Sequence, residues 1–446
     1  MLNIRKILLL LLLCVCAFSV RAQLFVSSSA ADDSGNGQSW ETAKRTLAGA
    51  LAVAGSNAHV YVMAGLYAET SELIIPSGVT VTGGYATNSA GTDLTQRNFP
   101  GTNSHWTDPT QCTILDGEMA HRVATVNQGA TLEGCVIRHG KTSSNGAGVL
   151  VDGGTLTHCV ITRCMAHSAT PGAQAKGGGV YVQNNGALHN CVICYNRADN
   201  GYGAAAASGD VVNNTITWNY ALDCGTVTDY DNNVYPTVVI GGQCWMRENL
   251  RTTHFADGTS IPSGLSASAT EPRYYNVGSS ASETNIYGLL YNVAAARHGT
   301  QNDYTDNVPS GMQGVCPDGW HLPSNAEFAQ MSTWLAEDEV FLCGSGAGNL
   351  AKSLSSNQYW QMSAVSCAVG NDLSANNLSL FDARPAGLYS GSFSGLYSQC
   401  YLWTTSRYGA SNNDCVYWTL SYDNAAFSSQ YATPDKGYSV RCVKNQ

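Results

Sequence analysis

A short segment recurs four times in the first half of the chain, and this repeat constrains the fold more than any other feature. The copies are GCVIRHG from residue 134, HCVITRC from 158, NCVICYN from 190 and NNTITWN from 213. They place Ile137, Ile161, Ile193 and Ile216 in one column. A unit of two or three short strands cannot bury its own apolar face, so it must stack on its neighbours. The repeat therefore predicts a right-handed parallel β-helix.

The alternation of side chains along each strand separates inward from outward positions. The cysteine two positions before each isoleucine points the same way as the isoleucine. Cys135, Cys159 and Cys191 are therefore expected to form an inward ladder of small apolar side chains rather than a set of ligands. Asn196 and Asn219 follow the repeat where an asparagine turn ladder would form, because asparagine tolerates left-handed backbone.

The segment before the repeats predicts an opening cap. SWETAKRTLAGALAVAG, residues 39–55, gives one apolar helical face with Ser39 available near the helix N-terminus. That face carries Leu47, Ala50, Leu51 and Ala54. DDSGNGQSWETAKRTL and VYVMAGLYAE resemble the start of β-helix proteins of the pectin-lyase-like superfamily, over roughly residues 24–220. That superfamily contains polysaccharide lyases and hydrolases, so the resemblance makes catalysis a hypothesis to test.

Glycosidic hydrolysis needs carboxylates that converge on one bond. Those of the repeats, Asp116, Glu118, Glu133, Asp152, Asp199 and Asp210, share no column on adjacent coils. A lyase would need a base such as Arg138 or Arg163 beside a calcium-binding acidic cluster, which is absent from the sequence pattern. We therefore predict no catalytic residue. The column His139, Arg163, Tyr195 and Trp218 is either a strip that binds sugar rings or four unrelated turn residues, and the sequence favours the second interpretation.

Residues 1–22 predict a signal peptide and hence a secreted or cell-surface location. Arg5 and Lys6 precede an apolar run over 7–18 that is too short to span a bilayer, so we expect no transmembrane segment in the mature chain. The net charge is −10, and losing the basic leader makes the chain more acidic. Nucleic acid is therefore a poor partner. The chain has sixteen cysteines, and export would allow disulfides.

After Asn219 the repeat stops, and residues 221–228 are expected to be a linker between a first domain, 23–220, and a second, 229–446. VYPTVVIGGQCWMRENL predicts two strands joined at Gly241 and Gly242. CPDGWHLPSNAEFAQMSTWLAEDE predicts a helix with a capping box of Ser324 and Glu327. Its apolar stripe contains Phe328, Met331 and Leu335.

Several blocks of the second half occur in a characteristic order: YDNNVYPTVVIGGQCWMRENLRTTHFADGTSI, YGLLYNVAAA, CPDGWHLPSNAEF, ARPAGLYSG, YLWTTS and GYSVRCVKN. Together they resemble the Fibrobacter succinogenes major paralogous domain, over about residues 229–446. The resemblance implies a C-type-lectin-like α+β fold whose two ends meet in one sheet. It implies a long-range disulfide between Cys316 and Cys442, and a shorter one between Cys400 and Cys415. Trp418 is followed by TLSYDN, which does not match the calcium-dependent sugar-binding motif of such lectins.

The block IGGQCWMRENL, residues 240–250, is interpreted as architecture rather than as an active site. Trp245 and Leu250 are expected in the core, and Arg247, Glu248 and Asn249 are expected to fix loops. No histidine or second nucleophile lies near Cys244 in the sequence to complete a catalytic arrangement.

The leading hypothesis is a non-enzymatic secreted or surface protein for adhesion or glycan binding, without cofactor or metal. Its partner would be an extracellular glycan or a host or surface protein. The expected ligand-binding residues are Trp403, Arg407, Tyr408, Tyr417 and Tyr422. The alternatives are a polysaccharide lyase or glycoside hydrolase acting through the β-helix, and a structural surface or matrix protein.

Overall fold

The computed structural model describes residues 22–100, 107–168, 170, 173–264, 266–278, 281–298, 311–346, 348–409 and 414–446. The predicted signal peptide lies outside these ranges, apart from its last residue. The chain divides into two compact units, one up to Tyr220 and one from Ala221. Each unit is described by itself.

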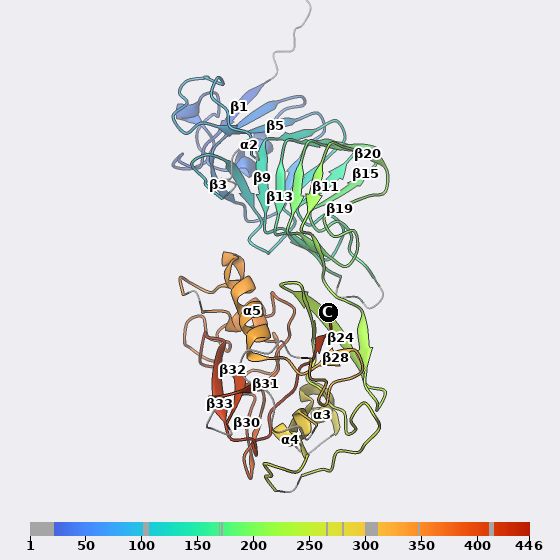
Figure 1. Cartoon of the computed structure of the whole chain (residues 1–446). Helices are drawn as coiled ribbons and strands as arrows, with labels where there is room; N and C mark the ends of the chain where they lie inside the picture. Colours follow the sequence, from blue (N-terminus) through green and yellow to red (C-terminus); the bar gives the residue numbers. More distant parts are fainter. Residues whose placement is uncertain are drawn as a thin grey trace, which may run out of the picture. The chain divides into compact units, whose positions relative to one another are not determined.

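The first unit is a parallel β-helix, as the repeat predicts (Figure 1). Its strands form four parallel stacks, the smallest of which begins only at Lys141. The seven-stranded stack contains β1 (Gln23–Val26), β2 (His59–Met63), β5 (Thr80–Tyr85), β8 (Thr131–Glu133), β12 (Thr155–Thr157), β16 (Gly186–His189) and β20 (Gly209–Val212). The six-stranded stack contains β3 (Gly65–Ala68), β6 (Thr113–Asp116), β9 (Cys135–Arg138), β13 (Val160–Thr162), β17 (Val192–Cys194) and β21 (Thr215–Thr217).

The other two stacks are smaller. The five-stranded stack contains β4 (Leu73–Ile75), β7 (Ala124–Val126), β11 (Val149–Asp152), β15 (Val180–Gln183) and β19 (Ala204–Ala206). The four-stranded stack contains β10 (Lys141–Thr142), β14 (Met165–Ala166), β18 (Arg197–Ala198) and β22 (Tyr220–Ala221).

The inward columns are those that the sequence predicts. Ile161 pairs in register with Ile137 on one side and with Ile193 on the other. Cys135, Cys159 and Cys191 are buried in the same core, so the predicted ladder of small apolar side chains is confirmed. The ladder fills the space between the stacks and leaves its thiols away from water.

The asparagine ladder is present, but for a different reason from the predicted one. Asn196 Oδ1 accepts a hydrogen bond from Cys164 N at 3.0 Å, and its Nδ2 donates to Ile161 O and Cys194 O. The left-handed residue of this turn is the preceding one, Tyr195, with φ of 59°. Asn196 is thus placed for its side-chain amide, which bridges coils, and not for its backbone.

The opening cap contains a 3-10 turn, η1 (Trp40–Thr42), and a helix, α2 (Leu47–Val53). The predicted apolar face is confirmed at Leu47, Ala50 and Leu51, which are buried. The predicted N-cap is wrong for this helix. Thr46 caps α2 by accepting from Gly49 N, whereas Ser39 begins the separate 3-10 turn.

The second unit is built on antiparallel sheets. One five-stranded sheet has the order β23 (Thr226–Thr228), β24 (Val234–Ile240), β25 (Gln243–Met246), β34 (Val443–Lys444) and β28 (Trp320–His321). A three-stranded sheet contains β31 (Gln399–Arg407), β32 (Cys415–Ser421) and β33 (Ser428–Ala432). Two hairpins are β26 (Tyr274–Asn276) with β27 (Leu289–Tyr291), and β29 (Ala386–Tyr389) with β30 (Phe393–Leu396). The five-stranded sheet joins the start of the unit to its end.

Short helices complete this unit. They are α3 (Ala281–Tyr287), α4 (Val293–Ala296), α5 (Asn325–Ala336), α6 (Ala351–Leu354) and the 3-10 turns η2 (Glu339–Phe341) and η3 (Leu373–Ala375). The capping box of Ser324 and Glu327 is confirmed at the start of α5, and the predicted stripe of Phe328, Met331 and Leu335 is buried. Among the described residues, none of the helices has the length and apolar character needed to span a bilayer.

The predicted hairpin at Gly241 and Gly242 is also confirmed. Both glycines have positive φ, 59° and 79°, as a tight two-residue turn requires. Alternation along β25 then sends Trp245 and Met246 into two different hydrophobic clusters. The five-stranded sheet therefore has a hydrophobic core on each of its two faces. These cores hold it in place as the support for the three-stranded sheet.

Candidate functional site

A pocket of about 430 Å³ lies on the three-stranded sheet of the second unit. It is lined by Asn325, Arg407, Tyr408, Val416, Ser429, Gln430 and Tyr431. Because β32 pairs antiparallel with both β31 and β33, residues that are distant in the sequence meet here. Val416 lies directly opposite Tyr431, and α5 supplies its first residue, Asn325.

The pocket is bordered by an exposed aromatic pair. Tyr408 and Tyr431 stack with ring centroids 3.9 Å apart and planes inclined by 10°. They remain 46% and 49% exposed, although large aromatic side chains usually lie in a core. Such a pair presents flat apolar ring surface next to phenolic hydroxyls, which suits a ligand with both apolar faces and hydroxyl groups.

The polar side of the pocket is held in place by hydrogen bonds. Trp418 Nε1 donates to Asn325 Oδ1 at 2.9 Å, and Asn325 N donates to Ser406 Oγ at 3.0 Å. These contacts fix the orientation of the Asn325 amide. Arg407 adds a cation and Gln430 an exposed amide. An aromatic wall with a few fixed polar groups is the usual construction of a small-molecule site.

The structure separates the five predicted ligand-binding residues. Arg407 and Tyr408 line the pocket. Trp403 does not, because its side chain is fully buried and its Nε1 donates to Tyr291 O at 2.8 Å. The prediction of Trp403 as an exposed ligand-binding residue is therefore wrong.

Tyr417 and Tyr422 are half-buried and are not among the pocket-lining residues. Tyr417 packs edge-on against Trp403 and Tyr438, with centroids 6.1 and 4.8 Å away, and burial raises its pKa. Tyr422 packs against the hydrophobic cluster around α5. Both side chains contribute to packing in this structure.

Five residues of the pocket are absent from the sequence-based set: Asn325, Val416, Ser429, Gln430 and Tyr431. The segment SSQYA, which becomes β33, lacks the apolar alternation that marks a half-buried strand. Its pairing with β32 is a tertiary feature, so nothing in the local pattern brings Tyr431 next to Tyr408.

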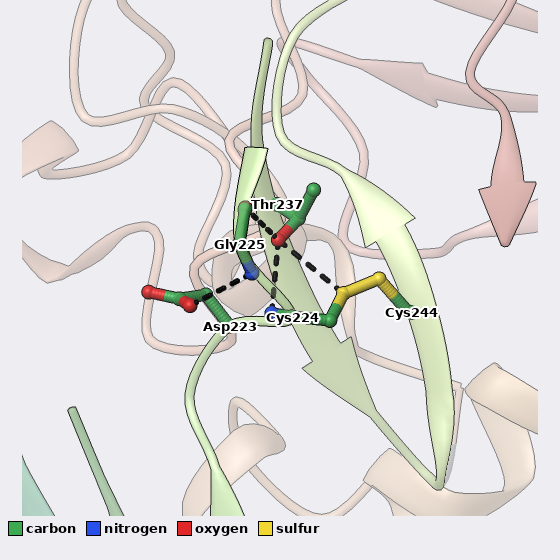
Figure 2. The surroundings of a disulfide bond; sticks show 5 residues. All are labelled: Asp223, Cys224, Gly225, Thr237 and Cys244. Carbon is green, nitrogen blue, oxygen red and sulfur yellow. Dashed lines mark hydrogen bonds between the residues drawn. A yellow bond between two sulfur atoms is a disulfide. The ribbon is translucent and has the colours of Figure 1, made fainter. Parts of the chain in front are cut away.

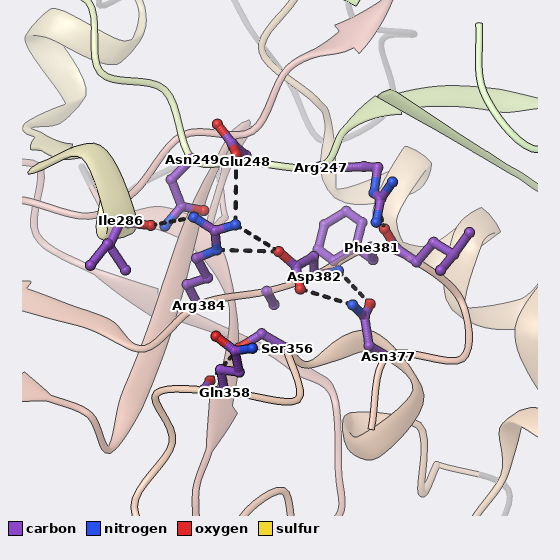
Figure 3. A network of polar contacts seen from close by, with 12 residues as sticks. Arg247, Glu248, Asn249, Ile286, Ser356, Gln358, Asn377, Phe381, Asp382 and Arg384 are labelled. Atoms are coloured by element: carbon purple, nitrogen blue, oxygen red, sulfur yellow. Dashed lines mark hydrogen bonds and ion pairs between the residues drawn. The ribbon is translucent and has the colours of Figure 1, made fainter. Parts of the chain in front are cut away.

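The block IGGQCWMRENL has the architectural role that the sequence predicts (Figure 3). Arg247 Nε donates to Leu380 O at 3.0 Å, which ties this block to a loop 133 residues away. Glu248 lies 3.6 Å from Arg384, and Asn249 is buried. These side chains are engaged in fixing loops.

Cys244 of the same block forms a disulfide with Cys224 (Figure 2). Its sulfur is therefore not a nucleophile. Thr237 Oγ1 accepts from Cys224 N at 3.0 Å, which holds the chain beside β24. The residues predicted as a linker, 221–228, thus include strand β23 and a disulfide, and they belong to the second compact unit.

Two further disulfides occur in the second unit. Cys316 and Cys442, the pair implied by the resemblance, are bonded, and Cys343 is bonded to Cys367. Neither Cys400 nor Cys415 forms a disulfide, so the shorter bond implied by the resemblance is absent. The strand register explains this: Cys415 lies opposite Arg407, seven residues along β31 from Cys400. Along β32, five residues separate Cys415 from Leu420, the residue opposite Cys400, so at ~3.3 Å per residue the two cysteines are about 16 Å apart.

The carboxylates of the β-helix are engaged singly. Asp116 contacts Arg138 Nε at 2.6 Å and His139 Nδ1 at 3.1 Å, but the Asp116 and Arg138 side chains are only 7% and 11% exposed. Burial acts to raise the pKa of Asp116, yet the hydrogen bond and charge of His139 outweigh it and hold that pKa below its usual value. Asp152 and Asp210 are instead engaged with neighbouring polar side chains. This geometry is that of structural ion pairing, and it does not bring two carboxylates to one bond.

The cysteines of the β-helix are poorly suited to chemistry. Burial raises the pKa of Cys135 to about 12, and burial also raises the pKa of Cys194 in the Cys191-x-x-Cys194 segment. Thiolates, not thiols, attack disulfides and bind metals. Within the described ranges, no three His, Cys, Asp or Glu side chains gather closely enough to hold a metal ion.

Of the comparisons with known proteins, the family models match most of the second unit. Residues 238–444 match the family model of the Fibrobacter succinogenes major domain. The chain matches no curated protein and no solved structure. The matched range begins within β24 and ends at the last residue of β34, so it covers β25, β28 and β34 and the end of β24, but not β23. The second unit of this chain is a Fibrobacter succinogenes major domain.

Proposed function

We propose that this chain is a secreted or surface-displayed protein whose Fibrobacter succinogenes major domain binds a glycan in the pocket between Tyr408 and Asn325. The observation that carries the proposal is the stacked, half-exposed pair of Tyr408 and Tyr431 at a pocket of about 430 Å³ that also contains the hydrogen-bonded amide of Asn325. Sugar rings combine apolar C–H faces with hydroxyl groups. Aromatic faces and amides match both parts of that chemistry.

The cysteines support the proposed location. Three disulfides are formed in the second unit, and such bonds persist mainly in oxidising compartments outside the cytoplasm. The predicted signal peptide points the same way. Adhesion is the biological role that a displayed glycan-binding domain would serve.

We also infer a C-type-lectin-like fold for this domain. Two observations support the inference. The sheet β25–β34–β28 joins the two ends of the domain, and the disulfide between Cys316 and Cys442 links residues 126 positions apart.

The test is a glycan array with the chain from Gln23 onward, alongside pulldown on insoluble polysaccharides with product release assayed in the same tubes. Tyr408→Ala and Tyr431→Ala should each weaken binding at least about tenfold, since burying a large apolar side chain against a ligand contributes ~1.5–3 kcal/mol. Tyr230→Ala is the matched control, because Tyr230 is an equally exposed tyrosine that does not line the pocket.

Other outcomes would contradict the proposal. Binding that survives both substitutions would show that the pocket is not the site. Release of sugar products would favour a lyase or hydrolase acting through the β-helix. A protein that retains no glycan would favour a structural surface or matrix role.

A further inference from the structure

Two ladders of left-handed residues run along the β-helix, one on each side of the six-stranded stack. The first precedes β9, β13, β17 and β21 and has φ values between 51° and 71°. It contains Gly134, His158, Asn190 and Asn213. The second follows the same four strands and has φ values between 53° and 59°. It contains His139, Arg163, Tyr195 and Trp218.

The two ladders share a backbone conformation but differ in composition. Glycine and asparagine, which tolerate left-handed backbone best, hold three of the four positions of the first ladder. Tyr195 and Trp218 hold the equivalent positions of the second, where a bulky side chain is an outlier. The first ladder, on the same coils, shows that this left-handed backbone prefers glycine and asparagine. Strain of this kind concentrates at functional sites, so the two rings call for an explanation beyond the turn itself.

The rings are exposed and in register. Thr162, Cys194 and Thr217 pair across adjacent coils, so the residues that follow them lie at strand spacing, ~4.8 Å apart. Tyr195 N donates to Trp218 O at 2.9 Å, which confirms that the two residues are neighbours. Tyr195 is 46% exposed and Trp218 is 62% exposed.

Two neighbours define the extent of this surface. Tyr220 N donates to Asn196 O at 2.9 Å, so Tyr220 lies beside the residue that follows Tyr195. His139 turns inward to Asp116 and is only 3% exposed, so the strip begins at the half-buried Arg163 on the next coil.

We propose that Arg163, Tyr195 and Trp218 form a second binding strip, which takes an extended neutral glycan of β-1,4-linked sugars along the axis of the β-helix. This site goes beyond the proposed function, because it lies in the other compact unit. Sugars with equatorial substituents present C–H groups on their ring faces, and these pack against the electron-rich faces of aromatic rings. Successive coils offer one side chain per rung, as an extended glycan offers one ring after another. Arg163 supplies donors for the hydroxyl groups, and the net charge of −10 disfavours an anionic chain.

The experiment removes the pocket first, so that the two sites can be told apart. The full chain from Gln23 carrying Tyr408→Ala and Tyr431→Ala is titrated calorimetrically with β-1,4-linked hexasaccharides of glucose, xylose and N-acetylglucosamine. Polygalacturonate serves as the anionic probe. Tyr195→Asn and Trp218→Asn are then added together, because asparagine keeps the left-handed turn, as Asn190 and Asn213 show.

We expect a neutral hexasaccharide to bind the chain that carries Tyr408→Ala and Tyr431→Ala. Adding the two asparagine substitutions should lower its affinity at least about tenfold. The melting temperature of the first unit should be unchanged or higher, because the turn is relieved of strain. Trp218→Phe, which keeps a ring, should retain most of the affinity. Tyr202→Ala is the matched control: Tyr202 is 41% exposed in the same unit but lies outside the ladder.

Three results would overturn this inference. They are unchanged affinity in the asparagine variants, no binding of any neutral hexasaccharide, and binding of polygalacturonate alone. A loss with Tyr202→Ala equal to that of the strip variants would also overturn it. The pocket of the second unit is already removed in every arm, so each result stands apart from the fate of the proposed function.

Discussion

At the scale of single residues, Arg441 holds the second unit together most directly. Its side chain is fully buried and donates to the backbone oxygens of Met246, Phe381 and Asp382, while its Nε donates to Asn249 Oδ1 at 2.9 Å. Burial lowers the pKa of Arg441 to about 10, so it stays protonated at neutral pH. One cation thus joins the last strand to the IGGQCWMRENL block and to a distant loop.

Replacing Arg441 by methionine should therefore strongly destabilise the second unit. The substitution leaves three backbone carbonyls and an amide oxygen buried without this donor, at ~1–3 kcal/mol for each unsatisfied group. We expect a loss of at least about 3 kcal/mol in the free energy of unfolding of the second unit, measured by urea titration. Arg273→Met is the control, since Arg273 pairs with a Glu271 side chain that is 67% exposed and should change stability by less than about 0.5 kcal/mol. Equal effects of the two substitutions would contradict the role given to Arg441.

Trp403 and Tyr431 show what the sequence can and cannot predict about the site. Both are aromatic residues of strands, yet Trp403 is fully buried and Tyr431 is 49% exposed. Composition identifies aromatic candidates, but the direction of each side chain depends on strand register and on what covers the sheet. Arg407 and Tyr408 were predictable because they end a recognisable strand, whereas Tyr431 required the pairing of β33 with β32.

At the scale of elements, the β-helix could be predicted in most of its detail because its repeat fixes register. The isoleucine and cysteine columns follow from alternation alone. The asparagine ladder lies at the predicted positions, but its cause is the side-chain amide and not a left-handed backbone at asparagine. The identity of the left-handed residue depends on turn geometry, which the residue type at one position does not determine.

The asparagine ladder offers a test of how coils are joined. Asn196→Ala removes the acceptor for Cys164 N and the donor to Ile161 O and Cys194 O, all in the buried interior. We expect the free energy of unfolding of the first unit to fall by ~2–4 kcal/mol, measured by thermal unfolding. Asn190→Gly is the control: Asn190 is exposed with φ of 53°, where glycine is tolerated, so its effect should stay within about 0.5 kcal/mol. A small effect of Asn196→Ala would show that the coils do not depend on this amide.

An ion pair at the start of α5 should make the stability of the second unit depend on pH. His321 Nε2 and Glu327 Oε1 lie 2.7 Å apart. Burial acts to lower the pKa of His321, but the bond and charge of Glu327 outweigh it and raise that pKa above 6.5. Burial likewise acts to raise the pKa of Glu327, but His321 and Ser324 hold it below 4.5.

The sign of each shift sets the pH window. The stabilisation from His321 is fully present below about pH 6.5 and is lost as the pH rises through the raised pKa. The stabilisation from Glu327 is present above about pH 4.5 and is lost as the pH falls through the lowered pKa. Glu327→Gln should therefore lower the urea midpoint of the second unit most between these values and less above pH 8. Glu271→Gln, at an exposed position, should leave the pH profile unchanged. A Glu327→Gln deficit that is constant from pH 4 to pH 9 would rule out the ion pair as its source.

At the scale of the whole molecule, the two-unit organisation could be predicted because the repeat ends where the first unit ends. The second unit begins at Ala221 and not at residue 229, since residues 221–228 lack the repeat and yet carry β23 and Cys224. Local composition marks them as a linker, and only the long-range pairing of Cys224 with Cys244 assigns them to the second unit. Disulfide connectivity in general depends on such distances and not on spacing in the sequence.

The distribution of disulfides predicts different responses of the two units to reduction. Among the described cysteines, all three disulfides lie in the second unit, while those of the β-helix are buried and form no disulfide. The bond between Cys316 and Cys442 closes the longest loop, 126 residues, and a loop of that size corresponds to ~5 kcal/mol in the chain-entropy account. In scanning calorimetry, dithiothreitol should lower the melting temperature of the second unit and leave that of the first unchanged. The double substitution Cys316→Ala and Cys442→Ala should reproduce most of this shift without reductant. Cys400→Ala, which removes a buried free thiol of the same unit, should shift it much less. If reduction moved both transitions equally, the stability of the β-helix would depend on the bonds of the second unit, and the two units would form one cooperative structure.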